Sequence, residues 1–247
     1  MSGPGWALVT GGARRLGRVL ALGAAEAGYD VIVHARNAED AAETVNLVRG
    51  MGRAAQSVGG DLADPEVPEA LIASSVGPVT LLVNCVSMFE NDKIESLTVA
   101  GLDAAYATNL RAPLLLAQAF AAALPNDRRG LIVNILDQRV WRLNPQFFSY
   151  TVTKAALWAA TQTLAQGLSP RIRVNAIGPG PVLASVHQSP EDFRAEAAAV
   201  PLGVAVNPAE IGQALRYLIA APSVTGQMIA VDGGQHLAWR TPDIIGD

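Results

Sequence analysis

The sequence is poor in the residues that mark several classes of protein. It has a single cysteine, Cys85, so the chain can form no internal disulfide and no cysteine-rich metal site. Its three histidines lie far apart without metal-ligand spacing, and we therefore expect no bound metal. Lys93 and Lys154 are its only lysines and the net charge is −4, so we expect no nucleic-acid partner.

Long hydrophobic segments are also missing. The longest apolar stretch, residues 112–124, carries Gln118 and is too short to span a bilayer. Residues 1–5 lack the basic and apolar regions of an export signal, so we expect a cytoplasmic protein with no membrane partner. The 247 residues are half apolar and 16% charged, which fits a single compact domain over residues 1–247 with a large core.

What the sequence does have is an alternation of two hydrophobic periods. Short runs rich in Val, Ile and Leu predict buried strands at 6–10, 30–35, 54–58, 80–84, 130–136, 173–176 and 227–231. Alanine-rich stretches with helical spacing lie between them, most clearly at 15–27, 38–51, 66–76, 99–124, 147–167 and 208–221. This order predicts an α/β fold, a doubly wound, seven-stranded parallel sheet with helices on both faces.

The segment 178–207 has no clear period. Four prolines interrupt it, and a short helix is predicted only over 191–200. A long irregular segment inside a compact domain is typical of an active-site lid. We therefore interpret 178–207 as a mobile flap over a substrate site.

Glycines cluster directly after the first predicted strand. The segment 10–17 reads TGGARRLG and opens the first helix. Gly11 allows a sharp exit from the strand, and Gly17 allows the helix to approach the sheet closely. The helix N-terminus offers free N–H groups to a pyrophosphate. This context predicts a dinucleotide site, although an ordinary tight turn is the alternative interpretation.

The residues after the second strand distinguish two dinucleotides. An acidic residue there would pair with the ribose 2′-hydroxyl of NAD, but the chain has Arg36 followed by Asn37. Arginine suits the 2′-phosphate of NADP, and Arg14 can join it, so NADPH is the predicted cofactor. The alternative is that Arg36 only caps a surface loop. Asp61 and Leu62 follow the third strand, where a side chain can reach the adenine.

Tyr150 and Lys154 lie near the start of a long predicted helix. A spacing of four residues puts them on one side, one turn apart. A phenol has a reference pKa of about 10 and is a poor acid at neutral pH. A neighbouring ammonium lowers that pKa. The pair therefore predicts a proton donor for hydride reduction.

With these residues in place, the chain resembles the short-chain dehydrogenase/reductase family over essentially its whole length. The glycine turn, Asn84, Asn109, the Tyr150–Lys154 pair and the GPG at 178–180 follow the family's order. The resemblance implies a Rossmann fold, a nicotinamide cofactor and often a homotetramer. It also implies that Lys154 holds the nicotinamide ribose and that Asn109 supports a proton relay through water. The residues expected to bind the cofactor are Gly11, Arg14, Arg15, Leu16, Gly17, His34, Arg36, Asn37, Asp61, Leu62, Asn84, Cys85, Ser87, Lys154, Pro179, Gly180 and Val182.

Departures from the family pattern point to one branch. Arg15 stands where most members have a third glycine, and Asp137 stands where most have a catalytic serine. Both resemble the pteridine reductases and dihydromonapterin reductases, and the SMF at 87–89 resembles their substrate loop. Cys85 departs from this branch, which usually keeps asparagine there, and this puts the strength of cofactor binding in doubt.

The substituted residues suit a flat, polar substrate ring. Arg15 places a permanent charge where cofactor phosphate and substrate meet. Phe89 offers a flat face to a pterin ring, and Asp137 can orient Tyr150 or pass a proton. Phe89 as a plain lid contact and Asp137 as an ion-paired loop acid are the alternatives. We predict catalytic roles for Tyr150, Lys154, Asp137 and Asn109, and substrate contacts for Arg15, Ser87, Phe89, Asp137 and Tyr150.

The sequence leaves three functions open. The leading hypothesis is an NADPH-dependent reductase that transfers hydride to a pteridine-like substrate of the dihydropteridine or dihydrofolate class, with Tyr150 as proton donor. The second is a carbonyl or 3-oxoacyl-thioester reductase of the same family, and the third is a non-catalytic dinucleotide-binding regulator. Phe147 either lines the site or packs in the core or at an interface, and His187 either touches substrate or is a solvated residue of the flap.

Overall fold

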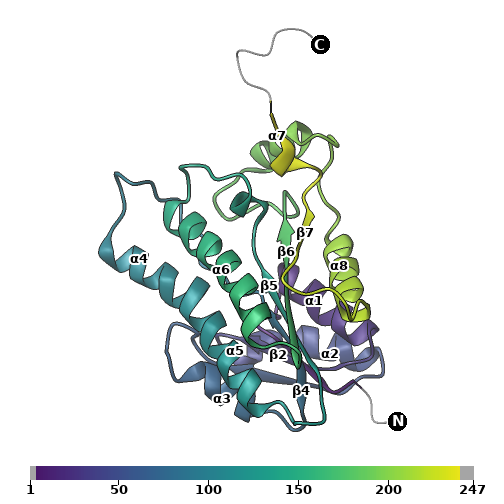
Figure 1. Cartoon of the computed structure of the whole chain (residues 1–247). Coiled ribbons are helices and arrows are strands. Elements are labelled where there is room, and N and C mark those ends of the chain that lie inside the picture. The colour runs from purple at the N-terminus through teal and green to yellow at the C-terminus, as the bar shows by residue number, and fades with distance from the viewer. Residues whose placement is uncertain (1–3, 240–247) are drawn as a thin grey trace.

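The computed structural model describes residues 4–239, and within them seven parallel strands form one sheet (Figure 1). The strand order is β3-β2-β1-β4-β5-β6-β7, so the chain changes direction between β1 and β4. In doubly wound sheets ligands bind at the carboxyl edge near such a point. The predicted seven-stranded parallel sheet is confirmed. Its strands are β1 (Trp6–Val9), β2 (Asp30–Ala35), β3 (Ala55–Gly59), β4 (Val79–Asn84), β5 (Gly130–Ile135), β6 (Ile172–Pro179) and β7 (Met228–Val231).

Helices cover both faces of the sheet, as predicted. One layer contains α1 (Arg15–Glu26), α2 (Ala42–Gly50) and α8 (Pro208–Ala220), with α1 packed on α8 (Figure 1). The other layer contains α3 (Val67–Ala73), α4 (Val99–Tyr106), α5 (Ala112–Ala123) and α6 (Phe148–Gly167). The short α7 (Pro190–Ala199) lies beyond the end of the sheet.

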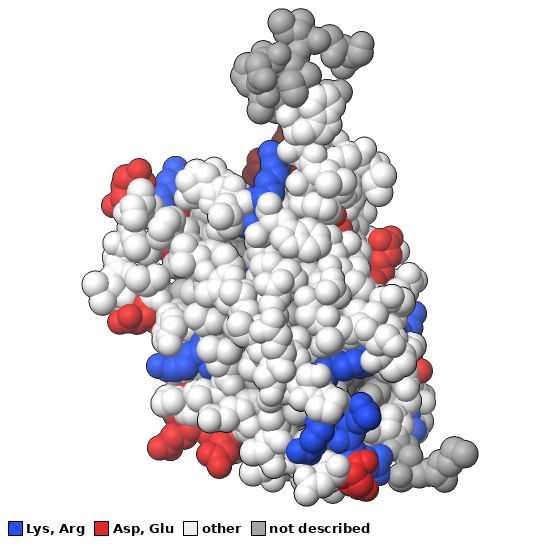
Figure 2. Space-filling view, viewed as in Figure 1, with Lys and Arg blue, Asp and Glu red and all other residues white. Residues whose placement is uncertain are grey.

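The surface shows no large area of one charge on the face drawn in Figure 2. Acidic and basic side chains are interspersed there, with a broad uncharged area between them. Within residues 4–239 no helix is long and apolar enough to cross a membrane. The same residues contain no group of three or more His, Cys, Asp or Glu side chains that would hold a metal ion.

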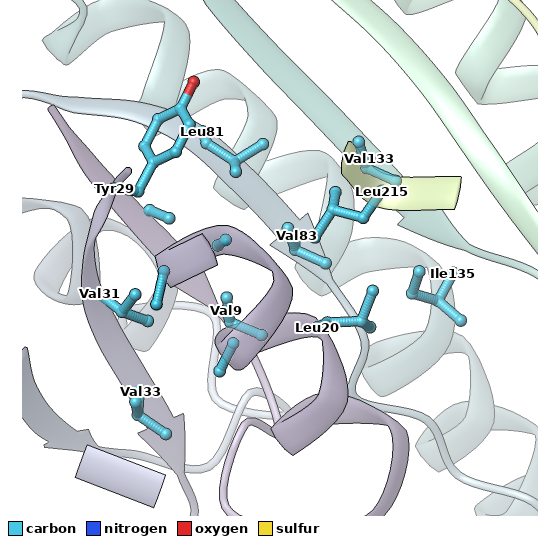
Figure 3. Close-up of a cluster of buried hydrophobic side chains, with 14 of the residues drawn as sticks. Val9, Leu20, Tyr29, Val31, Val33, Leu81, Val83, Val133, Ile135 and Leu215 are labelled. Atoms are coloured by element: carbon cyan, nitrogen blue, oxygen red, sulfur yellow. The ribbon is translucent and has the colours of Figure 1, made fainter. Parts of the chain in front are cut away.

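Alternate strand residues supply two cores, one on each side of the sheet. Val9, Val33 and Val83 lie in the core beneath α1 and α8, where they meet Leu20 and Leu215 (Figure 3). The intervening strand residues Leu8, Ile32 and Leu82 face Leu116 and Phe120 of α5. Because successive strand side chains point to opposite faces, a strand buried on both sides is apolar throughout. This explains the continuous apolar runs in the sequence.

The helix predicted over 99–124 is not continuous. One π-helical turn (Ala107–Arg111) separates α4 from α5. Such a turn inserts one residue into the helical repeat and often marks a functional position. Here it contains Asn109, which is fully buried. The apolar periodicity could not show the insertion, because the turns on both sides stay helical.

The irregular segment starts later than predicted. Gly178 and Pro179 belong to β6, because they pair with Ala230 and Val231 of β7. The short helix predicted over 191–200 is present as α7, and Ser189 begins it with a reciprocal capping box. The mobility of this segment stays a prediction.

Candidate active site

A cleft of about 1140 Å³ opens at the carboxyl edge of the sheet. It is lined by segments that follow β1, β4, β5 and β6 and by the first turns of α6. The predicted residues that line it are Gly11, Arg14, Arg15, Leu16, Gly17, Cys85, Ser87, Phe89, Asp137, Tyr150, Lys154, Pro179, Gly180 and Val182. Those outside its lining are His34, Arg36, Asn37, Asp61, Leu62, Asn84 and Asn109.

The glycine turn brings the start of α1 against the end of β1. Gly11 has φ +66°, in the left-handed region that favours glycine. A Cβ at Gly17 would lie 1.9 Å from the Gly11 carbonyl oxygen, so position 17 accepts only glycine without a backbone shift. Arg14 precedes α1 and makes no side-chain cap, and the first turn of α1 lines the cleft, where its N–H groups can bind an anion. These features fit the phosphates of a dinucleotide.

Arg15 ties this turn to the segment after β6. Its Nη2 donates to the carbonyl oxygens of Leu183 and Ala184, at 3.3 and 2.7 Å. Its φ is +52°, which explains why glycine is common at this position in the family that the sequence resembles. A non-glycine residue there costs about 1–2 kcal/mol, and such strain concentrates at functional sites.

His34 supports the turn from inside the protein. It is 2% exposed, and its Nδ1 accepts from the Gly11 N–H at 3.3 Å. Its Nε2 therefore carries the proton and lies 3.0 Å from the Gly60 carbonyl oxygen. Burial lowers the pKa of His34 and keeps the ring neutral. His34 braces the cofactor turn and does not reach the cleft.

Arg36 and Asp61 meet at the surface, outside the cleft. The Arg36 Nε lies 3.5 Å from Asp61 Oδ2, with both side chains more than half exposed. Asn37 donates to Asp40 Oδ2 at 3.5 Å, and Leu62 is buried in the core beneath α5. A 2′-phosphate would meet Arg36 paired with a carboxylate, which the sequence did not predict.

Asn84 belongs to a buried polar ladder. It donates through Nδ2 to Asn134 Oδ1 at 2.8 Å, and Asn134 donates to Thr161 of α6 at 2.9 Å. The Oδ1 of Asn84 is buried without a partner among the described residues. Next to it, the Cys85 N–H donates to Thr10 Oγ1 at 2.9 Å, and burial raises the pKa of the Cys85 thiol to about 11. The thiol is therefore neutral at physiological pH.

Asn109 fastens the 87–89 loop to α6. Its Oδ1 accepts from the Met88 N–H at 2.7 Å and from Ser87 Oγ at 3.3 Å. Its Nδ2 donates to the Met88 carbonyl at 2.9 Å and to Thr153 Oγ1 at 3.1 Å. Both polar atoms of the Asn109 amide are therefore used to hold the 87–89 loop in place. The predicted part of Asn109 in a proton relay stays a prediction.

Tyr150, Asp137 and Lys154 form the chemical centre of the cleft. The Tyr150 hydroxyl donates to Asp137 Oδ2 at 3.0 Å. Lys154 lies one helical turn on, donates from Nζ to the Ile135 carbonyl at 2.7 Å, and has Nζ 5.7 Å from the Tyr150 ring centroid. Tyr150 and Lys154 are both buried. The predicted placement of these two side chains on one side of α6 is therefore observed.

The predicted net lowering of the Tyr150 pKa was wrong, because burial and Asp137 outweigh any effect of Lys154. Burial raises the pKa of Tyr150 well above its usual value, and the Asp137 carboxylate raises it further. Burial also lowers the pKa of Lys154 to about 8, against the opposing effects of Cys85 and Asp137. Burial raises the pKa of Asp137, and Arg139 opposes that shift. Desolvation dominates because the groups lie at the base of the cleft.

Aromatic rings line one side of the cleft. Phe89 stacks on Phe147, and its centroid lies 4.7 Å from that of Tyr150 in an edge-on arrangement. The His187 ring lies 6.2 Å from Phe89, and its Nε2 is 3.0 Å from the Phe89 carbonyl oxygen. Phe147 and His187, which the sequence left open, therefore both line the cleft.

Arg139 also lines the cleft, and it was not predicted from the sequence. Its guanidinium carbon lies 5.1 Å from the Phe147 ring centroid and 5.7 Å from that of Phe89. The available signal was its position two residues after Asp137, where the chain leaves β5. Side chains at such strand ends point into the ligand crevice of a doubly wound sheet.

The chain is similar to several known proteins. A family model described as enoyl-(acyl carrier protein) reductase matches residues 11–236. FolM alternative dihydrofolate reductase 1 from Brucella canis, solved in complex with NADP, is 48% identical, covers 97% of both chains and has a TM-score of 0.92. A structure described as a short chain dehydrogenase/reductase family protein is 32% identical with a TM-score of 0.83, covering 94% of this chain and 97% of that one. L-xylulose reductase from Mesocricetus auratus is 32% identical over 92% of this chain and 95% of its own.

Proposed function

The chain belongs to the short-chain dehydrogenase/reductase family, and we propose that it acts there as an NADPH-dependent reductase of a pteridine-like ring. The observation that carries this proposal is the hydrogen bond from the Tyr150 hydroxyl to Asp137 Oδ2. Most members have a serine at position 137, which holds a substrate carbonyl oxygen. A carboxylate repels such an oxygen but accepts hydrogen bonds from the ring N–H groups of a reduced pteridine.

The cofactor part of the proposal rests on the glycine turn and on the arginines near it. The close approach at Gly17 and the uncapped first turn of α1 fit a pyrophosphate. Arg14 and Arg36 would supply positive charge for a 2′-phosphate, and Lys154 would hold the nicotinamide ribose. The similar FolM structure from Brucella canis contains NADP. When bound, the nicotinamide supplies the hydride.

Tyr150 holds the proton that the substrate ring must also receive. Its raised pKa keeps the hydroxyl protonated at neutral pH, and Asp137 fixes its position. The Lys154 ammonium lies close enough to stabilise the phenolate that forms as the proton leaves. A proton from solvent then restores the hydroxyl. Because the lysine acts mainly on the phenolate, its effect is greatest during proton transfer.

Phe89 and Ser87 would position the substrate ring. A flat ring stacked on Phe89 lies within reach of the Tyr150 hydroxyl, because the two side chains are in edge-on contact. Phe147 stacks on one face of Phe89, so a substrate ring would meet Phe89 on the side turned away from Phe147. Arg15, which joins the glycine turn to residues 183–184, would close the phosphate side of the cleft.

The experiment is a spectrophotometric assay of NADPH oxidation with dihydrobiopterin, dihydromonapterin and dihydrofolate. L-xylulose and a 3-oxoacyl thioester are the comparison substrates. We expect turnover of at least one pteridine, and a loss of about a hundredfold or more in Tyr150→Phe, which removes only the proton donor. Turnover of the carbonyl substrates alone would reject the pteridine proposal.

Carbonyl reduction is the second candidate. It is favoured by the similarity to L-xylulose reductase, and Asp137 stands against it. If pteridine reduction is native, Asp137→Ser should lose it and gain ketone reduction. A wild-type enzyme that reduces ketones better than this variant would favour carbonyl reductase. A purely regulatory role would be excluded by any turnover that depends on Tyr150.

The homotetramer implied by the family is also part of the proposal. Val99, Leu102 and Tyr106 give α4 an exposed apolar side, and Val152 adds to it from α6. Exposed apolar groups of this kind are typical of subunit contacts. Light scattering on the purified protein measures the mass directly, and a monomer at micromolar concentration would reject the tetramer.

A further inference from the structure

An arginine that the mechanism above does not use lies beside the Tyr150–Asp137 pair. Arg139 belongs to the 3₁₀ turn Gln138–Val140, directly after Asp137. Its backbone N–H donates to Asp137 Oδ1 at 2.8 Å, and its side-chain Nε lies 3.8 Å from the same oxygen. Tyr150 donates to the other oxygen, Oδ2. The two oxygens of Asp137 are thus divided between Arg139 and Tyr150.

The Arg139 guanidinium is held in place on its other side. It lies over the rings of Phe147 and Phe89, and its Nη1 makes long contacts with Asn144 Oδ1 at 3.5 Å and the Gln146 carbonyl at 3.4 Å. The side chain is only 15% exposed. This contact set fixes both the position and the orientation of the charge.

The side chain is not placed for good hydrogen bonding. The buried Nε of Arg139 has no hydrogen-bond partner among residues 4–239. Burying a charged donor without a partner is unfavourable, so another interaction must compensate for it. The compensating interaction is electrostatic, because the Asp137 carboxylate lies within ion-pair distance. Arg139 therefore acts on Asp137 as a fixed positive charge.

We propose that Arg139 is a positioning residue of the reduction: its charge keeps Asp137 ionised, and the carboxylate then holds the Tyr150 hydroxyl as the proton donor. This inference rests on the proposed role of Tyr150, and it is independent of which substrate is reduced. The residue does not contact the reacting atoms. It acts through Asp137.

The other groups that face Asp137 are few and come from three segments. Tyr150 and Lys154 face it from α6, and Lys154 favours the carboxylate less than Arg139 does. Cys85 faces the centre from the end of β4 and is neutral, because its pKa is raised to about 11. His187, from the segment after β6, contacts Phe89. Arg139 is thus the charge that most opposes the effect of burial on the pKa of Asp137.

The test is the pH dependence of kcat/KM in wild type, Arg139→Met and Arg139→Lys. Activity is lost on the acid side as the Asp137 carboxylate becomes protonated. Removing the neighbouring positive charge raises the pKa of Asp137, so we expect the acid limb of Arg139→Met to move upward by about one pH unit or more. Arg139→Lys keeps the charge, so its acid limb should stay close to the wild-type position. In an Asp137→Asn background, Arg139→Met should not change the pH profile of kcat/KM, because residue 137 no longer titrates.

Arg142→Met is the matched control. Arg142 lies on the same loop, lines the same cleft and carries the same charge, but it is exposed and is not among the groups that shift the pKa of Asp137, so its removal should leave the acid limb in place. An Arg139→Met enzyme that is slower at every pH, with an unmoved limb, would overturn the proposal and make Arg139 a packing residue. Thermal melting checks that each variant is folded. If Arg139→Met does not fold, the positions of the acid limbs in Arg139→Gln and Arg139→Lys are compared instead, with the same expected difference.

Different results would reject the pteridine substrate and the role of Arg139. If only carbonyl substrates turn over, the pteridine proposal fails, and the limb is then measured with the carbonyl substrate. If Tyr150→Phe keeps wild-type activity, Tyr150 is not the proton donor and the role of Arg139 fails with it.

Discussion

The Phe89 ring stacks on the Phe147 ring, with centroids 4.1 Å apart and planes 10° from parallel. Phe89 follows β4, whereas Phe147 immediately precedes α6 with a left-handed φ of 52°. A phenylalanine in that conformation costs about 1–2 kcal/mol. The stack, together with the Arg139 guanidinium over the Phe147 ring, offsets this strain. This side of the cleft is therefore a pre-formed aromatic surface.

Phe89→Leu should raise KM for a pteridine substrate by about two- to tenfold, with a smaller effect on kcat. The reason is that aromatic stacking contributes about 0.5–1.5 kcal/mol beyond the area that is buried. Steady-state kinetics with the best pteridine and with a non-aromatic carbonyl compound would separate stacking from general damage. An equal loss for both substrates would contradict a stacking role.

Gly17→Ala should abolish tight NADPH binding and destabilise the fold. The new methyl group would lie 1.9 Å from the Gly11 carbonyl oxygen, so the backbone of the turn must move. Strain of this kind costs about 1–3 kcal/mol. NADPH fluorescence titration and thermal melting measure the two effects.

Gly50→Ala is the control for that substitution. Gly50 ends α2, and a Cβ there meets nothing within 4 Å. We expect unchanged NADPH binding and a stability gain of up to about 1 kcal/mol. Equal losses in the two variants would show that the Gly17 effect is not specific to the turn.

Arg36→Leu should reduce the preference for NADPH over NADH by about tenfold, because a charge-assisted contact with the 2′-phosphate is lost. The ratio of kcat/KM for the two cofactors is the measurement, at low and high salt. Arg53→Leu removes the same charge from the Asp30 ion pair and should leave the ratio unchanged. A preference for NADPH that survives Arg36→Leu would assign the phosphate to another residue.

Cys85 should react slowly with iodoacetamide in the native protein. At pH 8 a thiol of pKa about 11 is almost wholly protonated, whereas the unfolded chain has an ordinary thiol pKa of about 8.5. Alkylation should therefore be about a hundredfold or more slower before unfolding, and it should accelerate as pH rises toward 11. Mass spectrometry measures one site, because the chain has one cysteine. Rapid native labelling at pH 7 would contradict the raised pKa.

The parts of the fold that follow from local pattern were predictable. Buried parallel strands are apolar along their whole length, and the TGGARRLG segment needs only its neighbours to form a turn between strand and helix. The spacing of Tyr150 and Lys154 was also enough to predict that they share one side of α6, because residues four apart lie one helical turn apart. The π-helical turn around Asn109 was not predicted, because it changes the helical repeat by only one residue.

The sequence by itself determined the layered α/β fold, the position of the glycine turn and the pairing of a tyrosine with a lysine, since each leaves a local pattern of residue types or spacing in the chain. Only the tertiary structure decided that burial raises the pKa of Tyr150, and that Arg139, Phe147 and His187 surround it. Desolvation and contacts between distant segments depend on how β4, β5, β6 and α6 meet at one edge of the sheet. The hydrophobic periodicity of the sequence does not show which side chains come together at that edge.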